Sequence, residues 1–376
     1  MLKLEPKPTT QVKYNYLDQQ FAHVDAYFED LRELVKSGEF TLGPYVEAFE
    51  KKFANYIGVK HAIGTNNGTD ALILALKAAG VKPGDEVITM PNTFIATVGA
   101  IVAAGARPVF ADCDERLQID ANKIEAAITP RTRAILPVHW GGCSPDLEAI
   151  LDIAERRGLE VVEDACPSVG AKVNGRFAGT FGKTSGFSMH PLKPLNVWGD
   201  GGIVVTNDDQ ANEFLRLYRN HGLLDRDHIE IWGVNNRLQP FQAVVASRVL
   251  DTVEDHIEAR IRNARQLDAG LGDLKEFIRT PARPVNNREV YQLYLALATR
   301  RDELVRHLVA RRIEAKVHYP IPLHLQNAAA QLGYKRGDFP VSERQADELI
   351  TLPAHQFITS DQIDYILNAI RSFYLG

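Results

Sequence analysis

Short apolar runs alternate with amphipathic segments through the middle of the chain, from about residue 60 to residue 206. The runs are HAIG (61–64), DEVITM (85–90), RPVFAD (107–112), RAILPV (133–138), LEVVED (159–164), TSGFSM (184–189) and GGIVVT (201–206). The segments between the first five, such as TDALILALKAAG and LEAILDIAERRG, have the periodicity of helices. Nearly continuous apolar strands that alternate with helices predict an α/β fold. We expect a mostly parallel seven-stranded sheet with helices on both faces.

The pattern changes after about residue 207. We expect helices near 237–255 and 256–271, a strand in YQLYLALA (291–298), a helix in RDELVRHLVARR, an extended KVHYPIPL and a last amphipathic helix in SDQIDYILNAIRSF. This mixture predicts a smaller C-terminal α+β domain. A chain of 376 residues suits two domains. We place a large domain with an N-terminal helical segment in residues 1–250 and the small domain in residues 251–376.

Composition excludes several classes of protein. The net charge is −5, so no basic field attracts nucleic acid or anionic lipid. No apolar run is long enough to span a membrane, and the start MLKLEPKPTTQVKYNYLDQQ lacks the apolar core of a signal peptide. Three cysteines without a CxxC pair argue against a disulfide scaffold and against a zinc site. We therefore expect a soluble cytoplasmic enzyme with no bound metal and with neither a nucleic-acid nor a membrane partner.

Ligands of such sheets bind at the carboxyl ends of the strands, which directs attention to the residues that follow each run. Asn67, Gly68 and Thr69 follow the first strand and open a helix that starts near Asp70. Free backbone N–H groups and the helix dipole make this a seat for an anion such as phosphate. A plain N-cap by Thr69 or Asp70 would give the same pattern.

Three further strand ends carry candidate residues. Asp164 ends LEVVED, where it could bind a ribose, a metal or a protonated ring nitrogen, or simply cap a helix. Phe94, in PNTFIAT, could stack on a cofactor ring or belong to the core. His139 and Trp140, in PVHWGG, leave the same choice open.

A lysine in the stretch SMHPLKPLNVWGDGG has an unusual setting. Lys193 lies between Pro191 and Pro194, and a proline restricts both its own φ and the residue before it. We therefore expect Lys193 in a stiff loop rather than in a helix. A fixed backbone with a mobile stem suits a lysine that must reach two positions at one reacting carbon.

Two nucleotide motifs fail on their spacing. GTFGKT (179–184) lacks the first glycine of a P-loop, because that position is Phe177. The glycines near residue 200 lack the GxGxxG spacing of a dinucleotide-binding turn. Nucleotide hydrolysis and NAD-dependent hydride transfer both lose support.

The remaining candidates form a set that matches the needs of pyridoxal phosphate. This cofactor requires a phosphate seat, a stacking partner, an acid beside its pyridine nitrogen and a lysine for the Schiff base. The phosphate seat would lie near Gly68, and the stacking partner would be Phe94. The acid would be Asp164, and the lysine would be Lys193. The combination is specific, whereas each residue alone is not.

Several longer segments resemble the DegT-type sugar aminotransferases. They include LGPYVEAFEKKFANYIGVKHAIGTNNGTDALILAL, GDEVITMPNTFIATVGAIVAAGARPVFAD, VVEDACPSVGA, FSMHPLKPLNVWGDGGIVVTND, WGVNNRLQPFQAVVA and KVHYPIPLHLQ. The resemblance covers nearly the whole chain. It implies the aspartate-aminotransferase-like fold (fold type I) and pyridoxal phosphate as cofactor.

The resemblance also implies roles for single residues. Lys193 matches the Schiff-base lysine and Asp164 the partner of the pyridine nitrogen. Phe94 matches the residue that stacks on the ring. The phosphate-binding positions are matched by Gly68, Thr69, Ser188 and Asn235. Asn235 would act from the neighbouring subunit, which implies a homodimer with shared active sites.

Two positions depart from the family pattern. Pro167 replaces a common glutamine that contacts the ring hydroxyl, and Pro194 replaces an asparagine after the lysine. HWGG also replaces the more usual HLYG, around Trp140. These changes affect the expected substrate more than the expected reaction.

The implied activity is transfer of an amino group, from L-glutamate as the expected donor, to a nucleotide-linked 3-keto or 4-keto hexose. His318 and His324 in HYPIPLH, together with His139 and Trp140, are candidates for the sugar pocket. A sugar dehydratase of the same fold is an alternative, but the related C-3 dehydratases have histidine in place of the lysine. A non-catalytic sensor or regulatory protein is a second alternative.

Overall fold

The computed structural model describes residues 11–376. Residues 1–10 lie outside the described part, and they form the first half of the segment MLKLEPKPTTQVKYNYLDQQ from which we argue against a signal peptide. The helices are α1 Leu17–Gln20, α2 Asp25–Ser37, α3 Pro44–Ile57, α4 Gly68–Ala78, α5 Ile95–Ala103, α6 Ala121–Ala127, α7 Leu147–Arg157, α8 Asp209–Tyr218, α9 Pro240–Gly270, α10 Arg301–Ala310, α11 Pro340–Glu348 and α12 Ser360–Tyr374. Short 3₁₀ turns are η1 Trp140–Gly142, η2 Leu323–Leu325 and η3 Asn327–Leu332.

The large sheet contains all seven predicted strands. They are β1 His61–Thr65, β2 Glu86–Thr89, β3 Arg107–Phe110, β4 Thr132–Ile135, β5 Glu160–Asp164, β8 Thr184–Ser188 and β9 Gly202–Thr206. Their order is β1-β9-β8-β5-β4-β2-β3, and only β9 runs antiparallel to its neighbours. The mostly parallel seven-stranded sheet is therefore confirmed. The antiparallel β9 follows from the absence of a crossover helix between β8 and β9.

Both faces of this sheet are buried. In β9 the side chains of Ile203 and Val205 pack with α3 and α9, whereas Val204 packs with α4 on the other face. Every residue of β2, β8 and β9 is buried. Continuous burial explains why these strands read as unbroken apolar runs rather than as an alternating pattern.

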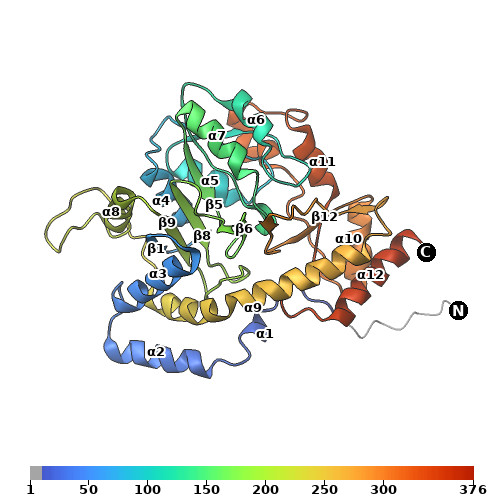
Figure 1. Cartoon of the computed structure of the whole chain (residues 1–376), viewed down its shortest axis with the longest axis horizontal. Helices are drawn as coiled ribbons and strands as arrows, with labels where there is room; N and C mark the ends of the chain where they lie inside the picture. Colours follow the sequence, from blue (N-terminus) through green and yellow to red (C-terminus); the bar gives the residue numbers. More distant parts are fainter. Residues whose placement is uncertain (1–10) are drawn as a thin grey trace.

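The C-terminal part carries a smaller antiparallel sheet, ordered β10-β12-β13, from Ile278–Arg279, Tyr294–Ala298 and Leu349–Leu352. A third sheet is formed by β11 Asn287–Arg288, β6 Lys172–Val173 and β7 Arg176–Phe177. Helix α9 contacts α2 and α3 near its start and α12 near its end, so it links the large sheet to the C-terminal helices (Figure 1). The division at residue 250 stays a prediction, and α9 runs across it.

Two local expectations were wrong. The segments 237–255 and 256–271 form one helix, α9, because no glycine or proline lies between Pro240 and Gly270 to interrupt it. The N-cap of α4 is Asn67, whose side-chain oxygen accepts a hydrogen bond from the Asp70 N–H at 2.9 Å. Asn67 caps better than the predicted Thr69 or Asp70 since its own backbone is extended while theirs is helical.

Among residues 11–376, no helix has the length and apolar character needed to cross a membrane. The same part of the chain holds no cluster of three or more histidine, cysteine or carboxylate side chains suited to a metal ion.

Candidate active site

A cavity of about 550 Å³ opens at the carboxyl edge of the large sheet. It is lined by residues at or after the ends of β1, β2, β4, β5 and β8, and by residues of the C-terminal part. From the predicted set these are Gly68, Thr69, Phe94, Trp140, Asp164, Ser188, Lys193 and His318. Residues far apart in the sequence therefore meet at one place, where ligands of such sheets are expected.

The start of α4 forms one wall of the cavity. The first N–H groups of an α-helix have no partner within it, and here Gly68 and Thr69 hold these positions. Gly68 packs tightly against β8, since a Cβ on Gly68 would lie 2.6 Å from the Ser188 Cβ. A side chain at this position would displace Ser188, which also lines the cavity, so the close packing of the start of α4 on β8 requires glycine.

Asp164 ends β5 and is 3% exposed. Its Oδ2 accepts a hydrogen bond of 2.7 Å from the Thr97 hydroxyl, and its Oδ1 accepts one of 3.2 Å from the Cys166 N–H. A carboxylate held from two sides has a fixed orientation, and each oxygen keeps a free lone pair. Asp164 can therefore accept a further hydrogen bond from a group in the cavity.

Lys193 lies in the loop between β8 and β9, outside any helix, as its prolines predict. Its backbone N–H donates to the His190 carbonyl at 2.8 Å, and its carbonyl accepts from Asn196 Nδ2 at 2.9 Å. Burial lowers the pKa of the Lys193 amine below its ordinary value, while the neighbouring Asp164 partly opposes this shift. A lowered pKa enlarges the share of neutral amine, the form that attacks a carbonyl.

Aromatic side chains form the remaining wall. Phe94 is 51% exposed and lies 6.0 Å from Tyr319, whose ring is in turn 5.7 Å from Trp140, measured between ring centroids. Tyr14 and His318 stack on each other at 5.9 Å and also line the cavity. These rings offer flat apolar surfaces to a cofactor or to a sugar ring.

His318 differs from the other rings because it can titrate. Burial lowers its pKa to about 4, with further lowering by Lys193 and Lys316. Its Nδ1 lies 2.9 Å from the Thr351 hydroxyl. The imidazole is therefore neutral at pH 7.

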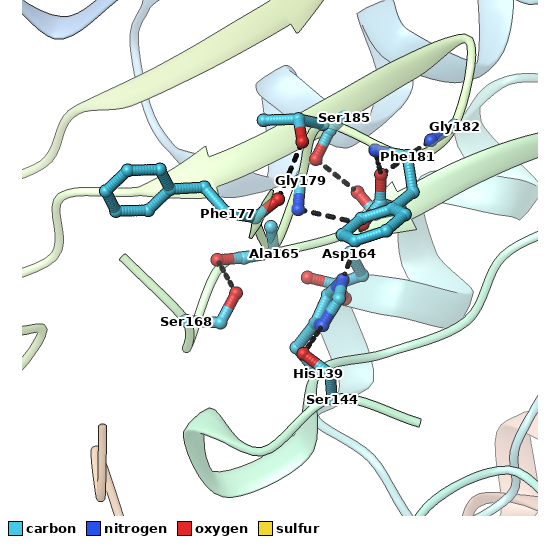
Figure 2. Close-up of polar contacts among 12 residues, drawn as sticks. His139, Ser144, Asp164, Ala165, Ser168, Phe177, Gly179, Phe181, Gly182 and Ser185 are labelled. Carbon is cyan, nitrogen blue, oxygen red and sulfur yellow. Dashed lines mark hydrogen bonds and ion pairs between the residues drawn. The ribbon is translucent and has the colours of Figure 1, made fainter. Parts of the chain in front are cut away.

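Two predicted pocket residues do not reach the cavity. His139 is fully buried, and its two ring nitrogens lie 2.9 Å from Ser144 Oγ and 2.9 Å from Glu163 Oε2, as Figure 2 shows for its contact with Ser144. His324 is 2% exposed and pairs with Glu343 at 3.0 Å. Neither histidine lines the cavity, so the structure places both away from the expected sugar pocket. Both are instead held within the protein by carboxylates.

Asn235 also lies outside the cavity of its own chain. Asn235 is exposed. Its side-chain oxygen accepts a hydrogen bond from Arg237 Nε at 3.1 Å, and its backbone carbonyl accepts one from Asn66 Nδ2 at 3.1 Å. Its expected role from a second subunit stays a prediction.

Sequence reasoning missed several residues of the site. Thr93 and Thr97 stand in PNTFIAT beside Phe94, and Tyr319 stands beside His318. Their neighbours in sequence were signals that could have pointed to them. Tyr14 precedes the first predicted strand, so only the fold brings it to the cavity.

The DegT/DnrJ/EryC1/StrS aminotransferase family matches the chain over residues 23–371. The chain belongs to this family.

Relatives of known name agree with this membership. The chain is 38% identical to a dTDP-3-amino-3,4,6-trideoxy-α-D-glucose transaminase of Micromonospora megalomicea, over 98% of this chain and 100% of the relative. It is 42% identical to a protein of Geobacillus stearothermophilus named a pleiotropic regulatory protein, over 92% of this chain and 93% of that relative.

Solved structures agree as well. DesV of S. venezuelae, in complex with a ketimine intermediate, is 37% identical with a TM-score of 0.95, covering 98% of this chain and 100% of that one. A further neighbour was solved with pyridoxamine phosphate bound. The sequence prediction of a pyridoxal-phosphate-dependent sugar aminotransferase is confirmed by these similarities.

Proposed function

We propose that this enzyme transfers the amino group of L-glutamate to a nucleotide-linked 3-keto hexose, with Lys193 as the residue that binds the cofactor covalently. The observation that carries the assignment is the single cavity shared by Lys193, Asp164, Phe94 and the start of α4. The 3-keto position is favoured because the Micromonospora relative is named for a 3-amino sugar.

The residues present fit pyridoxal phosphate. When bound, this cofactor supplies an electron sink that stabilises a carbanion at the substrate carbon. The helix start at Gly68 and Thr69 would hold its phosphate, with the Ser188 hydroxyl beside them. Phe94 would cover one face of the ring, and Asp164 would accept a hydrogen bond from the ring nitrogen and keep that nitrogen protonated.

Lys193 has a second task once its amine is free. The amine would remove the proton from the substrate carbon that bears the amino nitrogen and return it to the cofactor carbon bonded to that same nitrogen, as a general base and then a general acid. A lowered pKa suits this work, because the neutral amine is the base. The backbone contacts of Lys193 with His190 and Asn196 hold its main chain while the stem moves.

The substrate class can be tested directly. Purified enzyme would be given L-glutamate with a panel of nucleotide-linked 3-keto and 4-keto hexoses, and release of 2-oxoglutarate measured. We expect turnover with a 3-keto sugar and none from Lys193→Ala. Turnover by Lys193→Ala, or no release with any keto-sugar, would contradict the proposal.

The two alternative functions are not favoured. The dehydratase alternative conflicts with a lysine at position 193. A sensor without catalysis has no need for a buried carboxylate and an amine of lowered pKa in one cavity.

We further infer a homodimer with shared sites. Large apolar side chains are exposed around the segment that carries Asn235: Leu224 (64%), Ile229 (57%), Trp232 (88%), Val234 (40%) and Phe241 (42%). Such a patch on a soluble protein marks an interaction surface. A second copy covering it would bring Asn235 towards the neighbouring phosphate seat. We place this dimer in the reducing cytoplasm, which suits the free thiols of the three cysteines.

Complementation tests the shared site. Lys193→Ala and Asn235→Ala proteins would be co-expressed and mixed dimers isolated. If each site takes Lys193 from one chain and Asn235 from the other, mixed dimers contain one intact site and regain about half the wild-type activity. A mixed dimer as inactive as its parents, or a monomer in light scattering, would refute the shared site.

A further inference from the structure

A hydroxyl of helix α5 contacts the carboxylate of Asp164. Thr97 lies in the first turn of α5, is 1% exposed, and its Oγ1 is 2.7 Å from Asp164 Oδ2. The contact joins the segment after β2 to the end of β5. Nothing in the proposed function requires a partner for Asp164 on this side.

A second hydroxyl fixes the direction of this hydrogen bond. Thr93 Oγ1 lies 3.0 Å from Thr97 Oγ1, and Thr93 is 2% exposed. A threonine hydroxyl has one proton, so when Thr97 donates to the ionised Asp164 its oxygen must accept from Thr93. The hydrogen bonds then lead from Thr93 to Thr97 and from Thr97 to Asp164, and both hydroxyl protons point towards the carboxylate.

The other oxygen of Asp164 is held from the opposite side. Oδ1 accepts from the Cys166 N–H at 3.2 Å. Together the two contacts set the plane of the carboxylate. A donated hydrogen bond also stabilises the charged form of a carboxyl group over its neutral form.

We propose that Thr97, oriented by Thr93, is a positioning residue that holds the carboxylate of Asp164 and keeps it aimed at the ring nitrogen of the cofactor. The inference rests on the proposed function, since Thr97 acts only through Asp164. Its loss leaves one buried carboxylate oxygen without its donor, and the ring nitrogen is then held protonated less firmly.

Two variants of Thr97 distinguish the effect of its hydroxyl from the effect of its methyl group. Thr97→Val keeps the shape and removes the hydroxyl, while Thr97→Ser keeps the hydroxyl. Thr97→Ala replaces Thr97→Val if the latter does not fold. Thr184→Val is the control, because Thr184 is also 1% exposed but donates at 2.8 Å to the Ala75 carbonyl, away from Asp164.

The readouts are the visible absorption of the bound cofactor as a function of pH, and kcat and KM for the keto-sugar. We expect Thr97→Val to lower kcat by about ten- to a hundredfold with little change in KM, and to alter the pH dependence of the visible band. Thr97→Ser should restore both. Thr93→Val should cause a loss of a few-fold, about the size of a hydrogen bond between neutral groups. Thr184→Val should leave the spectrum unchanged.

Two results would overturn the inference: a spectrum and kcat of Thr97→Val equal to wild type, or equal impairment of Thr97→Val and Thr97→Ser. Both require that the wild-type protein binds the cofactor. A wild-type protein that takes up no cofactor would instead refute the proposed function, and this inference with it.

Discussion

Lys193 differs from the surface lysines of this chain in what surrounds its amine. Lys36, for example, is largely exposed and pairs with Glu33 one helical turn away. The amine of Lys193 instead lies in a cavity beside a buried carboxylate, and burial lowers its pKa. The same side chain is a solvated charge in one setting and a buried amine in the other, and the proposed role of Lys193 as a nucleophile depends on this difference.

Phe94 tests the site at the residue scale. Because its ring is half exposed at the cavity wall, Phe94→Ala should cost little stability. It should weaken cofactor affinity by about tenfold through the loss of ring stacking. Equilibrium titration of the apoenzyme with pyridoxal phosphate measures this. Phe28→Ala is a matched control, since Phe28 is also 51% exposed but lies on α2 and does not line the cavity. Equal losses in both variants would contradict a stacking role.

At the scale of elements, one buried carboxylate ties β5 to the loop that leads into β8. Glu163 is fully buried and accepts from the N–H groups of Gly179, Phe181 and Gly182 at 2.8, 2.6 and 2.7 Å, besides its contact with His139 (Figure 2). Burial alone would raise the pKa of Glu163, but His139 and the N–H groups of Gly182 and Gly179 outweigh burial and lower this pKa. Two neighbouring residues of β5 thus make different contacts: Glu163 binds the loop that leads into β8, and Asp164 lines the cavity.

We expect Glu163→Gln to destabilise the fold by about 2–4 kcal/mol. The amide NH₂ would face N–H donors in a fully buried site. Denaturant unfolding measures the loss, with the exposed Glu213→Gln as control. Since the Glu163 side chain does not line the cavity, KM for the keto-sugar should change little. An unchanged free energy of unfolding would show that the carboxylate does not hold the loop.

The elements that sequence predicted well are those with strong local patterns. All seven strands of the large sheet were predicted, since each is a short run that is set off from the helical segments beside it, and β2, β8 and β9 are buried along their whole length. The sequence predicted two helices where the structure has the single helix α9, because apolar periodicity does not show whether a helix is continuous. Strand β13 (349–352) was not predicted, because its apolar residues directly follow helix α11. Local pattern alone cannot show whether a boundary lies between two such elements.

Prediction of the site followed the same limit. The sequence places Gly68, Asp164 and Lys193 at strand ends or in a proline-bounded loop, so their position at the cavity could be predicted. His139 also follows a strand, but its ring turns into the protein towards Glu163, and side-chain direction at a strand end depends on tertiary packing. His324 is likewise drawn to Glu343, which is distant in sequence.

At the scale of the whole molecule, the N-terminal segment closes against the C-terminal part. Val12 pairs with Ile313, and the carbonyl of Lys13 accepts from His355 Nε2 at 3.1 Å. The Phe357 N–H donates to His355 Nδ1 at 3.2 Å. These two contacts require a neutral imidazole, with its proton on Nε2. Burial lowers the pKa of His355 to about 4, with a further contribution from Arg260.

This histidine makes the fold sensitive to acid. The unfolded chain takes up a proton on His355 near its ordinary pKa of about 6.5, whereas the folded chain resists until about pH 4. The free energy of unfolding therefore falls as pH drops from about 6.5 to 4, by up to about 3 kcal/mol from this group. Denaturant unfolding at several pH values should show a smaller acid loss in His355→Gln, whose amide can keep both contacts. The exposed His228→Gln is the control. An identical pH dependence in His355→Gln and wild type would refute the assignment.

The central claim is that Lys193 binds the cofactor covalently in this cavity. The most direct measurement is reduction of the purified holoenzyme with borohydride, which makes the lysine–cofactor bond permanent, followed by proteolysis and mass spectrometry of the peptides. We expect the cofactor on the peptide that contains Lys193, and on no peptide of Lys193→Ala. A reduced adduct on another lysine of the wild-type protein, or no adduct at all, would contradict the account.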